Sequence, residues 1–221
     1  MIAARFDLVI FDCDGVLVDS EPIINRAHAD VLTACGYPIT PEDLVERFCG
    51  MSDPEMLEII EREWGRALPP FYFRRVGEII EHGYRSLAAI PGVAEVIDAL
   101  SLPICVASSS TPAQIRRKLE LTGLLAHFGE HLFSATMVTR GKPAPDLFLY
   151  AARRIRVEPG RCLVVEDSPA GITAACAAGM TVIGFCGGSH CGPQHGARLR
   201  AHGAAAVIAD IRELSTAVSA L

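Results

Sequence analysis

Two aspartates, Asp12 and Asp14, follow a short apolar run, Leu8 to Phe11, and precede Gly15. Such a run predicts a buried strand of a parallel sheet, and the glycine permits a sharp turn after it. In open α/β sheets, ligands bind at the carboxyl ends of the strands. Because uncompensated carboxylates are costly at a buried strand end, the pair predicts a bound cation there. An aspartate held near a metal can also act as a nucleophile.

Polar and charged residues follow at three further points where strands should end or helices begin. They are Ser108-Ser109-Ser110 after the apolar run 103–107, Lys142 in Gly-Lys-Pro-Ala-Pro-Asp, and Glu166-Asp167 after the apolar run 162–165. Lysine is rare in this chain, since only Lys118 and Lys142 occur among 20 basic residues. A lysine at position 142, within one of these segments, is therefore stronger evidence for a functional role than it would be in a lysine-rich chain.

In order and in kind, these four segments resemble the motifs of the haloacid dehalogenase superfamily, the Asp-x-Asp-Gly phosphohydrolases, over essentially the whole chain. The resemblance implies that Asp12 is the nucleophile and takes the phosphoryl group as an aspartyl-phosphate. It implies that Asp14 protonates the departing alkoxide and then activates the water that cleaves this intermediate. An ionised oxygen nucleophile needs no base for the attack if a cation offsets the repulsion from the phosphate.

The resemblance also implies Mg²⁺ as the cofactor, which suits a set of oxygen ligands. Asp12, the backbone carbonyl of Asp14 and Asp167 would hold it, and Glu166 would bind through water or orient the ligands. Further roles fall to Lys142, which would neutralise Asp12 and the phosphate, and to Ser108 and the Ser109 N–H, which would hold phosphate oxygens.

Several of these residues also have a purely structural interpretation. Asp12 and Asp14 could form a structural turn, and Ser108 could cap the helix expected from Pro112. A hydrogen-bonded acid at a strand end is a further interpretation of Glu166. We interpret Asp19 as a turn or hinge residue rather than a catalytic one.

The fold class predicted is α/β, a doubly wound, Rossmann-like parallel sheet with a helical cap inserted after the first strand. Strands are expected at 6–11, 103–107, 131–134, 162–166, 180–185 and 205–208, with helices such as 146–155 between them. Residues 20–88 instead repeat apolar positions at helical spacing. We therefore expect a catalytic core of residues 1–19 and 89–221 and a helical cap of residues 20–88 that sets substrate specificity.

The composition of the chain limits the kinds of molecule that it is expected to bind. The formal net charge of −6 over 221 residues argues against nucleic acid, and no apolar stretch reaches the ~18 residues that span a bilayer. The eight cysteines are scattered, which favours a reducing compartment. We expect a cytoplasmic monomer that acts on a small phosphorylated metabolite, with no nucleic-acid or membrane partner.

Two cysteines and two histidines lie close together in one segment: Cys186, His190, Cys191 and His195. Their spacing matches none of the usual structural zinc patterns. The segment is rich in glycine and follows a predicted strand. We therefore favour a surface loop near the mouth of the site, with a zinc site as the alternative.

Within the superfamily, the sequence most resembles β-phosphoglucomutase and its phosphatase relatives. Asp14 and Asp167 argue against a metal-independent dehalogenase, and the absence of lysine from 20–88 argues against a phosphonoacetaldehyde hydrolase. A mutase is expected to carry a cap histidine and a phosphate-binding arginine, where this chain has Ile24 and Asp53.

The resulting prediction is a Mg²⁺-dependent phosphatase that hydrolyses a small phosphomonoester, such as a sugar or sugar-acid phosphate. A phosphosugar mutase is the first alternative and a non-enzymatic binding module the second. Arg47, Cys49 and Ser52 are the cap residues expected to contact the substrate.

Overall fold

The computed structural model describes residues 2–48 and 53–221, so Cys49 and Ser52 lie outside the described residues. The chain forms two compact units, a core unit of Met1–Asp19 with Ala88–Leu221 and a helical unit of Ser20–Leu87. This division falls within one residue of the boundary expected from the sequence. The role of the helical unit in substrate specificity stays a prediction.

A six-stranded parallel sheet in the order β3-β2-β1-β4-β5-β6 forms the centre of the core unit. Its strands are β1 (Leu8–Phe11), β2 (Ile104–Ser108), β3 (Leu132–Ser134), β4 (Cys162–Glu166), β5 (Thr181–Phe185) and β6 (Ala206–Ile208). Phe11 of β1 pairs with Val106 of β2 and with Val165 of β4. The residues just beyond these pairs therefore lie at one edge of the sheet. The predicted α/β class with a parallel sheet is confirmed.

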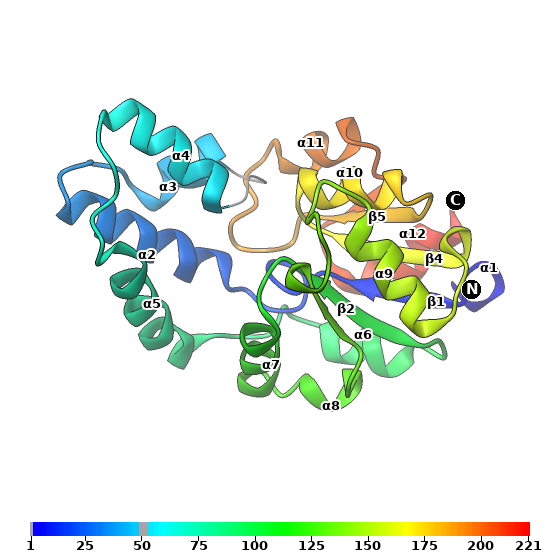
Figure 1. Ribbon diagram of the computed structural model, residues 1–221. Helices are drawn as coiled ribbons and strands as arrows, with labels where there is room; N and C mark the ends of the chain where they lie inside the picture. The colour runs from blue at the N-terminus through cyan, green and yellow to red at the C-terminus, as the bar shows by residue number, and fades with distance from the viewer. Residues whose placement is uncertain (1, 49–52) are drawn as a thin grey trace. The chain divides into compact units, whose positions relative to one another are not determined.

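Helices pack on both faces of this sheet, as Figure 1 shows for the core unit. They are α1 (Ile2–Arg5), α6 (Val93–Ala99), α7 (Pro112–Leu121), α8 (Leu125–Phe128), α9 (Asp146–Ile155), α10 (Pro169–Ala177), α11 (His195–Ala201) and α12 (Leu214–Ser219). Short 3-10 turns add η2 (Ala135–Met137), η3 (Pro159–Arg161) and η4 (Ile211–Glu213). On one face Leu8 and Ile10 pack with Phe148 of α9 and Ile172 of α10. Toward the other face, the Phe11 ring meets that of Phe128 in α8 edge to face, with ring centroids 6.3 Å apart.

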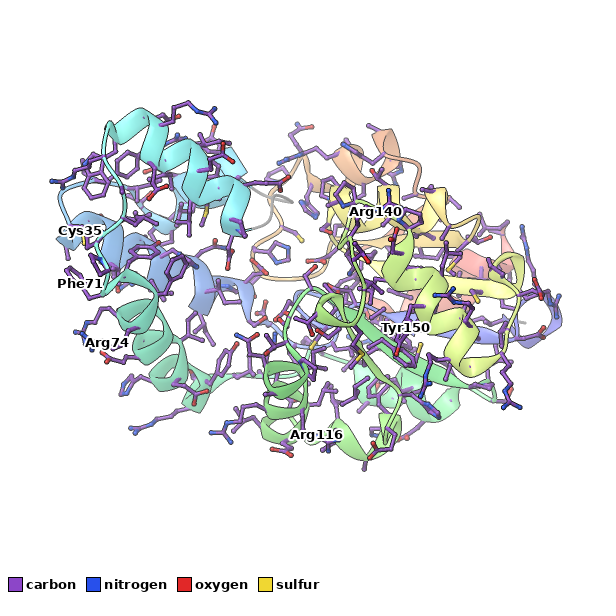
Figure 2. The ribbon with its side chains drawn as sticks, in the orientation of Figure 1. Cys35, Phe71, Arg74, Arg116, Arg140 and Tyr150 are labelled. Atoms are coloured by element: carbon purple, nitrogen blue, oxygen red, sulfur yellow. The ribbon has the colours of Figure 1, made fainter. Side chains whose placement is uncertain are left out.

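Residues near the site start two of these helices. Thr111, not Ser108, is the N-cap of α7, and it forms a reciprocal capping box with Gln114. The structural interpretation of Ser108 as a cap is therefore wrong. In α10 the N-cap is Ser168, whose hydroxyl accepts the Gly171 N–H. Arg140 lies in the segment before α9, and Tyr150 on α9 packs its ring against Phe133 (Figure 2).

The helical unit contains α2 (Glu21–Ala34), α3 (Pro41–Phe48), α4 (Asp53–Trp64), α5 (Tyr72–Gly83) and η1 (Tyr84–Ser86). Its apolar core includes Leu32, Leu44 and Ile60, and His28 Nδ1 lies 2.7 Å from the Tyr72 hydroxyl. Figure 2 labels Cys35, Phe71 and Arg74 in this unit. Over the whole described chain, the helices are too short or too polar to cross a bilayer.

Candidate active site

The first feature of the site is a buried cluster of charges at the carboxyl ends of β1 and β4. Lys142 Nζ donates to Asp12 at 2.8 Å and to Glu166 at 2.6 Å. All three side chains are at least 90% buried. The structure thus brings together three residues that lie up to 154 positions apart in the sequence (166 − 12). The motifs predict that these three residues belong to one site.

Asp12, Glu166 and Asp167 each place a carboxylate oxygen within 4.8 Å of the other two. Burial raises the pKa of the Asp12 and Asp167 carboxyls well above the usual range, and their acidic neighbours act in the same direction. Lys142 supplies one positive charge against three carboxylates. Because this oxygen-rich, acidic set lacks matching positive charge, it fits a hard divalent cation such as Mg²⁺.

Glu166 has both carboxylate oxygens engaged within the protein. Oε1 accepts from Lys142, and Oε2 accepts the Ser168 N–H at 2.7 Å and its hydroxyl at 3.1 Å. These bonds favour a role in orienting Lys142 and the start of α10. They leave Asp12 and Asp167 as the better candidates for direct contact with a cation.

Burial opposes the charge on Lys142, but attraction to Asp12 and Glu166 outweighs it and raises the pKa of the ammonium above its ordinary value. Lys142 is therefore cationic at neutral pH. Its Nζ also lies 5.1 Å from the centre of the Phe148 ring. A fixed positive charge beside Asp12 is suited to holding the negative charge of a phosphate.

Asp14 makes contacts that the sequence analysis did not predict. Lys118 Nζ lies 2.5 Å from both carboxylate oxygens of Asp14 and donates to Ser110 Oγ at 2.8 Å. Ser110 Oγ in turn donates to Asp14 at 2.9 Å. The Lys118 side chain is only 2% exposed. Lys118 thus contacts Asp14, and Lys142 contacts Asp12. The rarity of lysine in the sequence was the one signal that could have pointed to Lys118.

The serines after β2 lie at the same edge of the sheet. Ser108 is buried, and its Oγ accepts the Ser110 N–H at 3.1 Å. The Ser110 carbonyl accepts the Ser134 hydroxyl at 2.7 Å, which anchors this turn to β3. Ser109 is exposed. The use of Ser108 and the Ser109 N–H as phosphate contacts stays a prediction.

The segment between β5 and α11, together with the first residue of α11, packs against Asp167. His190 Nε2 lies 3.0 Å from Asp167 Oδ2, and His195 Nε2 lies 2.6 Å from the Asp167 backbone oxygen. Burial lowers the pKa of His195, although its hydrogen bond to the Asp167 backbone oxygen acts in the opposite direction. The interpretation of this segment as a surface loop is wrong for its two histidines, because His195 is buried and the His190 side chain is only 6% exposed.

Gly15 lets the chain pass close to this acidic edge. Its φ is +73°, and a Cβ there would lie 1.9 Å from Asp167 Oδ2. Glycine is therefore required twice, for its conformation and for space. Asp19 accepts the Ser189 N–H at 3.1 Å, which ties the segment after Gly15 to the β5–α11 connection. This bond agrees with the interpretation of Asp19 as a structural residue.

Within the helical unit, Arg47 donates to Glu63 at 2.6 Å and to the Tyr37 hydroxyl at 3.2 Å. Asp53 begins α4, and its Oδ2 lies 3.7 Å from His28 Nε2. Arg47 is thus paired inside its own unit. Its contact with the substrate stays a prediction, as do those of Cys49 and Ser52.

The fold and this edge define a class of protein: a doubly wound α/β protein with an acidic, lysine-containing site at the carboxyl ends of parallel strands. The family model of the haloacid dehalogenase-like hydrolases matches residues 6–179. The chain therefore belongs to this family, and the membership predicted from the motifs is confirmed.

Known proteins resemble the chain over most of its length. It is 33% identical over 189 residues to 6-phosphogluconate phosphatase of Escherichia coli K12, covering 85% of this chain and 86% of that one. A conserved haloacid dehalogenase-like protein of unknown function from Agrobacterium tumefaciens C58 has a TM-score of 0.89 and 40% identity, covering 97% and 98% of the two chains. A hydrolase of the same family from Deinococcus radiodurans R1, solved with phosphate and sodium, has a TM-score of 0.81 and 34% identity, covering 98% and 96%.

Proposed function

We propose that this protein is a Mg²⁺-dependent phosphatase that hydrolyses a small sugar or sugar-acid phosphate through a phosphoryl group carried on Asp12. The observation that carries the proposal is the Asp12 carboxylate at the end of β1, bonded to the buried ammonium of Lys142. The similarity to 6-phosphogluconate phosphatase supports the phosphatase activity and the substrate class.

Asp12, the Asp14 backbone carbonyl and Asp167 would hold Mg²⁺, with Glu166 acting behind them. When bound, the ion would offset the charge of the phosphate and of the carboxylates. Asp12 Oδ attacks phosphorus while the bond from phosphorus to the ester oxygen breaks. Lys142 keeps Asp12 in place and stabilises the negative charge that collects on the phosphoryl oxygens. Ser108 and the Ser109 N–H complete the contacts to phosphate.

Asp14 has the role of acid and then base. It gives a proton to the departing alkoxide, then takes one from the water that attacks the phosphoryl group on Asp12. Lys118 and Ser110 hold the Asp14 carboxylate by three contacts of 2.5–2.9 Å. We assign Lys118 as a positioning residue, since it acts on the reaction through Asp14.

Hydrolysis is favoured over phosphosugar transfer by the residues of the helical unit. Ile24 provides no proton donor or acceptor, and Asp53 adds a negative charge that would repel the distal phosphate of a bisphosphate. Water should therefore accept the phosphoryl group. We further propose that the protein acts as a cytoplasmic monomer without nucleic-acid or membrane partners. Its net charge of −6 supports the lack of a nucleic-acid partner.

A panel of small phosphomonoesters, including 6-phosphogluconate and hexitol phosphates, tests the proposal. Phosphate release is measured with Mg²⁺, with EDTA, and with Mg²⁺ restored after EDTA. We expect turnover of sugar or sugar-acid phosphates that EDTA abolishes and Mg²⁺ restores. Turnover that persists in EDTA would refute the metal dependence, and no release from any ester would refute the phosphatase activity.

A further inference from the structure

Three potential metal ligands meet where the connection after β5 enters α11, beside the candidate active site. His190, Cys191 and His195 each place a ligand atom within 4.8 Å of the other two. Cys191 Sγ lies 3.4 Å from His190 Nε2, and the two imidazole ring centroids are 5.5 Å apart. One thiol and two imidazoles form a soft to borderline donor set, unlike the carboxylates of the neighbouring Asp12 cluster.

The distances suit a tetrahedral Zn²⁺ ion. With Zn–S of about 2.3 Å and Zn–N of about 2.0–2.1 Å, sulfur and nitrogen ligands of one tetrahedral ion are roughly 3.5 Å apart. The separation of 3.4 Å between Cys191 Sγ and His190 Nε2 is close to this value. The two atoms therefore need little rearrangement to bind the same ion.

The orientation of His195 supports the same conclusion. A backbone carbonyl can only accept, so His195 Nε2, which lies 2.6 Å from the Asp167 oxygen, carries the proton. In the neutral ring, Nδ1 is then the nitrogen with the lone pair that a metal takes. Metal-binding histidines typically donate their other N–H to a carbonyl or carboxylate in this way.

A surface cavity of about 680 Å³ provides a route to these ligands. Cys191, Gly192, Pro193 and Arg200 are among the residues that line it. Cys191 is only partly buried. An ion can therefore enter from solution on the side of Cys191.

We propose that His190 Nε2, Cys191 Sγ and His195 Nδ1 form a second metal site, selective for thiophilic divalent ions such as Zn²⁺, and that its occupancy inhibits the hydrolase. Binding releases the thiol proton of Cys191. With the ring proton of His190 on Nδ1, the ion also replaces the 3.0 Å contact between His190 Nε2 and Asp167 Oδ2, a carboxylate that the proposed function assigns to Mg²⁺. Inhibition by Zn²⁺ thus rests on the proposed function, whereas binding of the ion does not.

Metal titration of a matched pair of cysteine variants tests the site. C191S removes the thiolate, while C186S removes a nearby cysteine that lines the same cavity but lies outside the ligand cluster. Co²⁺ is titrated into the apo-protein, and the thiolate-to-Co²⁺ charge-transfer absorption is recorded. We expect this absorption, at one equivalent, in the parent chain and in C186S, and its loss in C191S and in the second variant C191A.

The inhibition is measured with Zn²⁺ in the presence of excess Mg²⁺. The parent chain and C186S should share one inhibition constant, and C191S should need at least tenfold more Zn²⁺, with unchanged activity in Mg²⁺ alone. An equal Co²⁺ absorption in C191S would overturn the site. Equal Zn²⁺ inhibition in C191S would overturn the coupling to Asp167. If Co²⁺ bound through Cys191 but no ester were hydrolysed, the proposed function would fail and the metal site would stand.

Discussion

The Asp12–Lys142 pair is buried, and it also shares its ammonium with Glu166. Taking such charges out of water costs roughly several kcal/mol per ion. Apolar residues of similar volume at the same positions often stabilise a fold equally well or better. A buried cluster with more carboxylates than cations is thus poorly explained by stability. It is well explained by chemistry that needs a fixed nucleophile and a fixed positive charge beside it.

Asp14→Asn separates the acid and base roles of Asp14 from binding, because it keeps the backbone carbonyl and leaves Asp12 intact. A sugar phosphate, whose alkoxide must be protonated, should lose most of its turnover, by about 10²–10⁴-fold. An aryl phosphate with a good leaving group should keep more of its phosphorylation rate, and the phosphorylated enzyme should accumulate. Rapid quench with both substrates measures this. Equal losses without an accumulated intermediate would make Asp14 a structural residue.

Lys118→Met tests positioning, since it removes the ammonium that contacts Asp14 but keeps the length of the buried side chain. We expect kcat for a sugar phosphate to fall at least about tenfold, equivalent to ~1.4 kcal/mol, with KM changed less than threefold. The loss should be smaller for an activated aryl phosphate. Arg116→Met on the same helix (labelled in Figure 2) is the control, because its guanidinium is half exposed and contacts only Glu130 among the ion pairs described. An unchanged kcat in Lys118→Met would refute the assignment.

At the level of elements, α10 begins in close contact with the acidic edge of the sheet. Ser168 caps the helix and also donates to Glu166. A Cβ at Gly171 would lie 1.7 Å from Glu166 Oε1, which accepts from Lys142. The start of α10 and the ion pair of Lys142 with Glu166 therefore both depend on the absence of a side chain at Gly171.

Gly171→Ala should displace Glu166 and so disturb both stability and activity. Overpacking of a buried site costs roughly 1–3 kcal/mol, which lowers Tm by about 2–4 °C per kcal/mol in a chain of this size. Thermal unfolding and phosphate release are measured together. Gly160→Ala is the control, because a Cβ there meets nothing within 4 Å. A Tm and activity like those of Gly160→Ala would contradict this account of α10.

The sequence predicted these elements well where the chain repeats a simple pattern. Each apolar run that was expected to be a strand is one, because buried parallel strands are continuously apolar. The predicted ends of these strands then placed Asp12, Glu166 and Asp167 correctly at the carboxyl edge of the sheet. Lys118 could not be predicted in the same way, since its partner Asp14 lies 104 residues away and helical spacing does not reveal which tertiary contact a side chain makes.

The β5–α11 connection shows a second limit. Its three glycines and Pro193 indicate a loop, but loop composition does not predict which side chains turn inward. Only the fold shows that His190 and His195 contact Asp167. In the core unit, the alternative interpretation of Ser108 as the cap of α7 was wrong for a simpler reason: Ser108 and Thr111 are both good N-cap residues, and the capping box with Gln114 decides between them.

For the whole molecule, the question is whether water or a sugar takes the phosphoryl group from Asp12. Given β-glucose 1-phosphate and a bisphosphate primer, the protein should form no glucose 6-phosphate, because neither the apolar side chain of Ile24 nor the carboxylate of Asp53 is suited to binding a phosphate. Free phosphate should be released from hexose or sugar-acid phosphates instead. Coupled assays for glucose 6-phosphate and for phosphate, run in parallel, measure both. Isomer formation faster than phosphate release would mean that the protein is a mutase.

The central claim is that Asp12 carries the phosphoryl group during hydrolysis of a small phosphate ester. The most direct test compares phosphate release by the parent chain and by Asp12→Asn with saturating Mg²⁺, on the best ester from the panel. An amide is a poor nucleophile and a weaker ligand, so we expect Asp12→Asn to have no measurable turnover while it remains folded. Activity within about tenfold of the parent, a barrier change of only ~1.4 kcal/mol, would contradict the account.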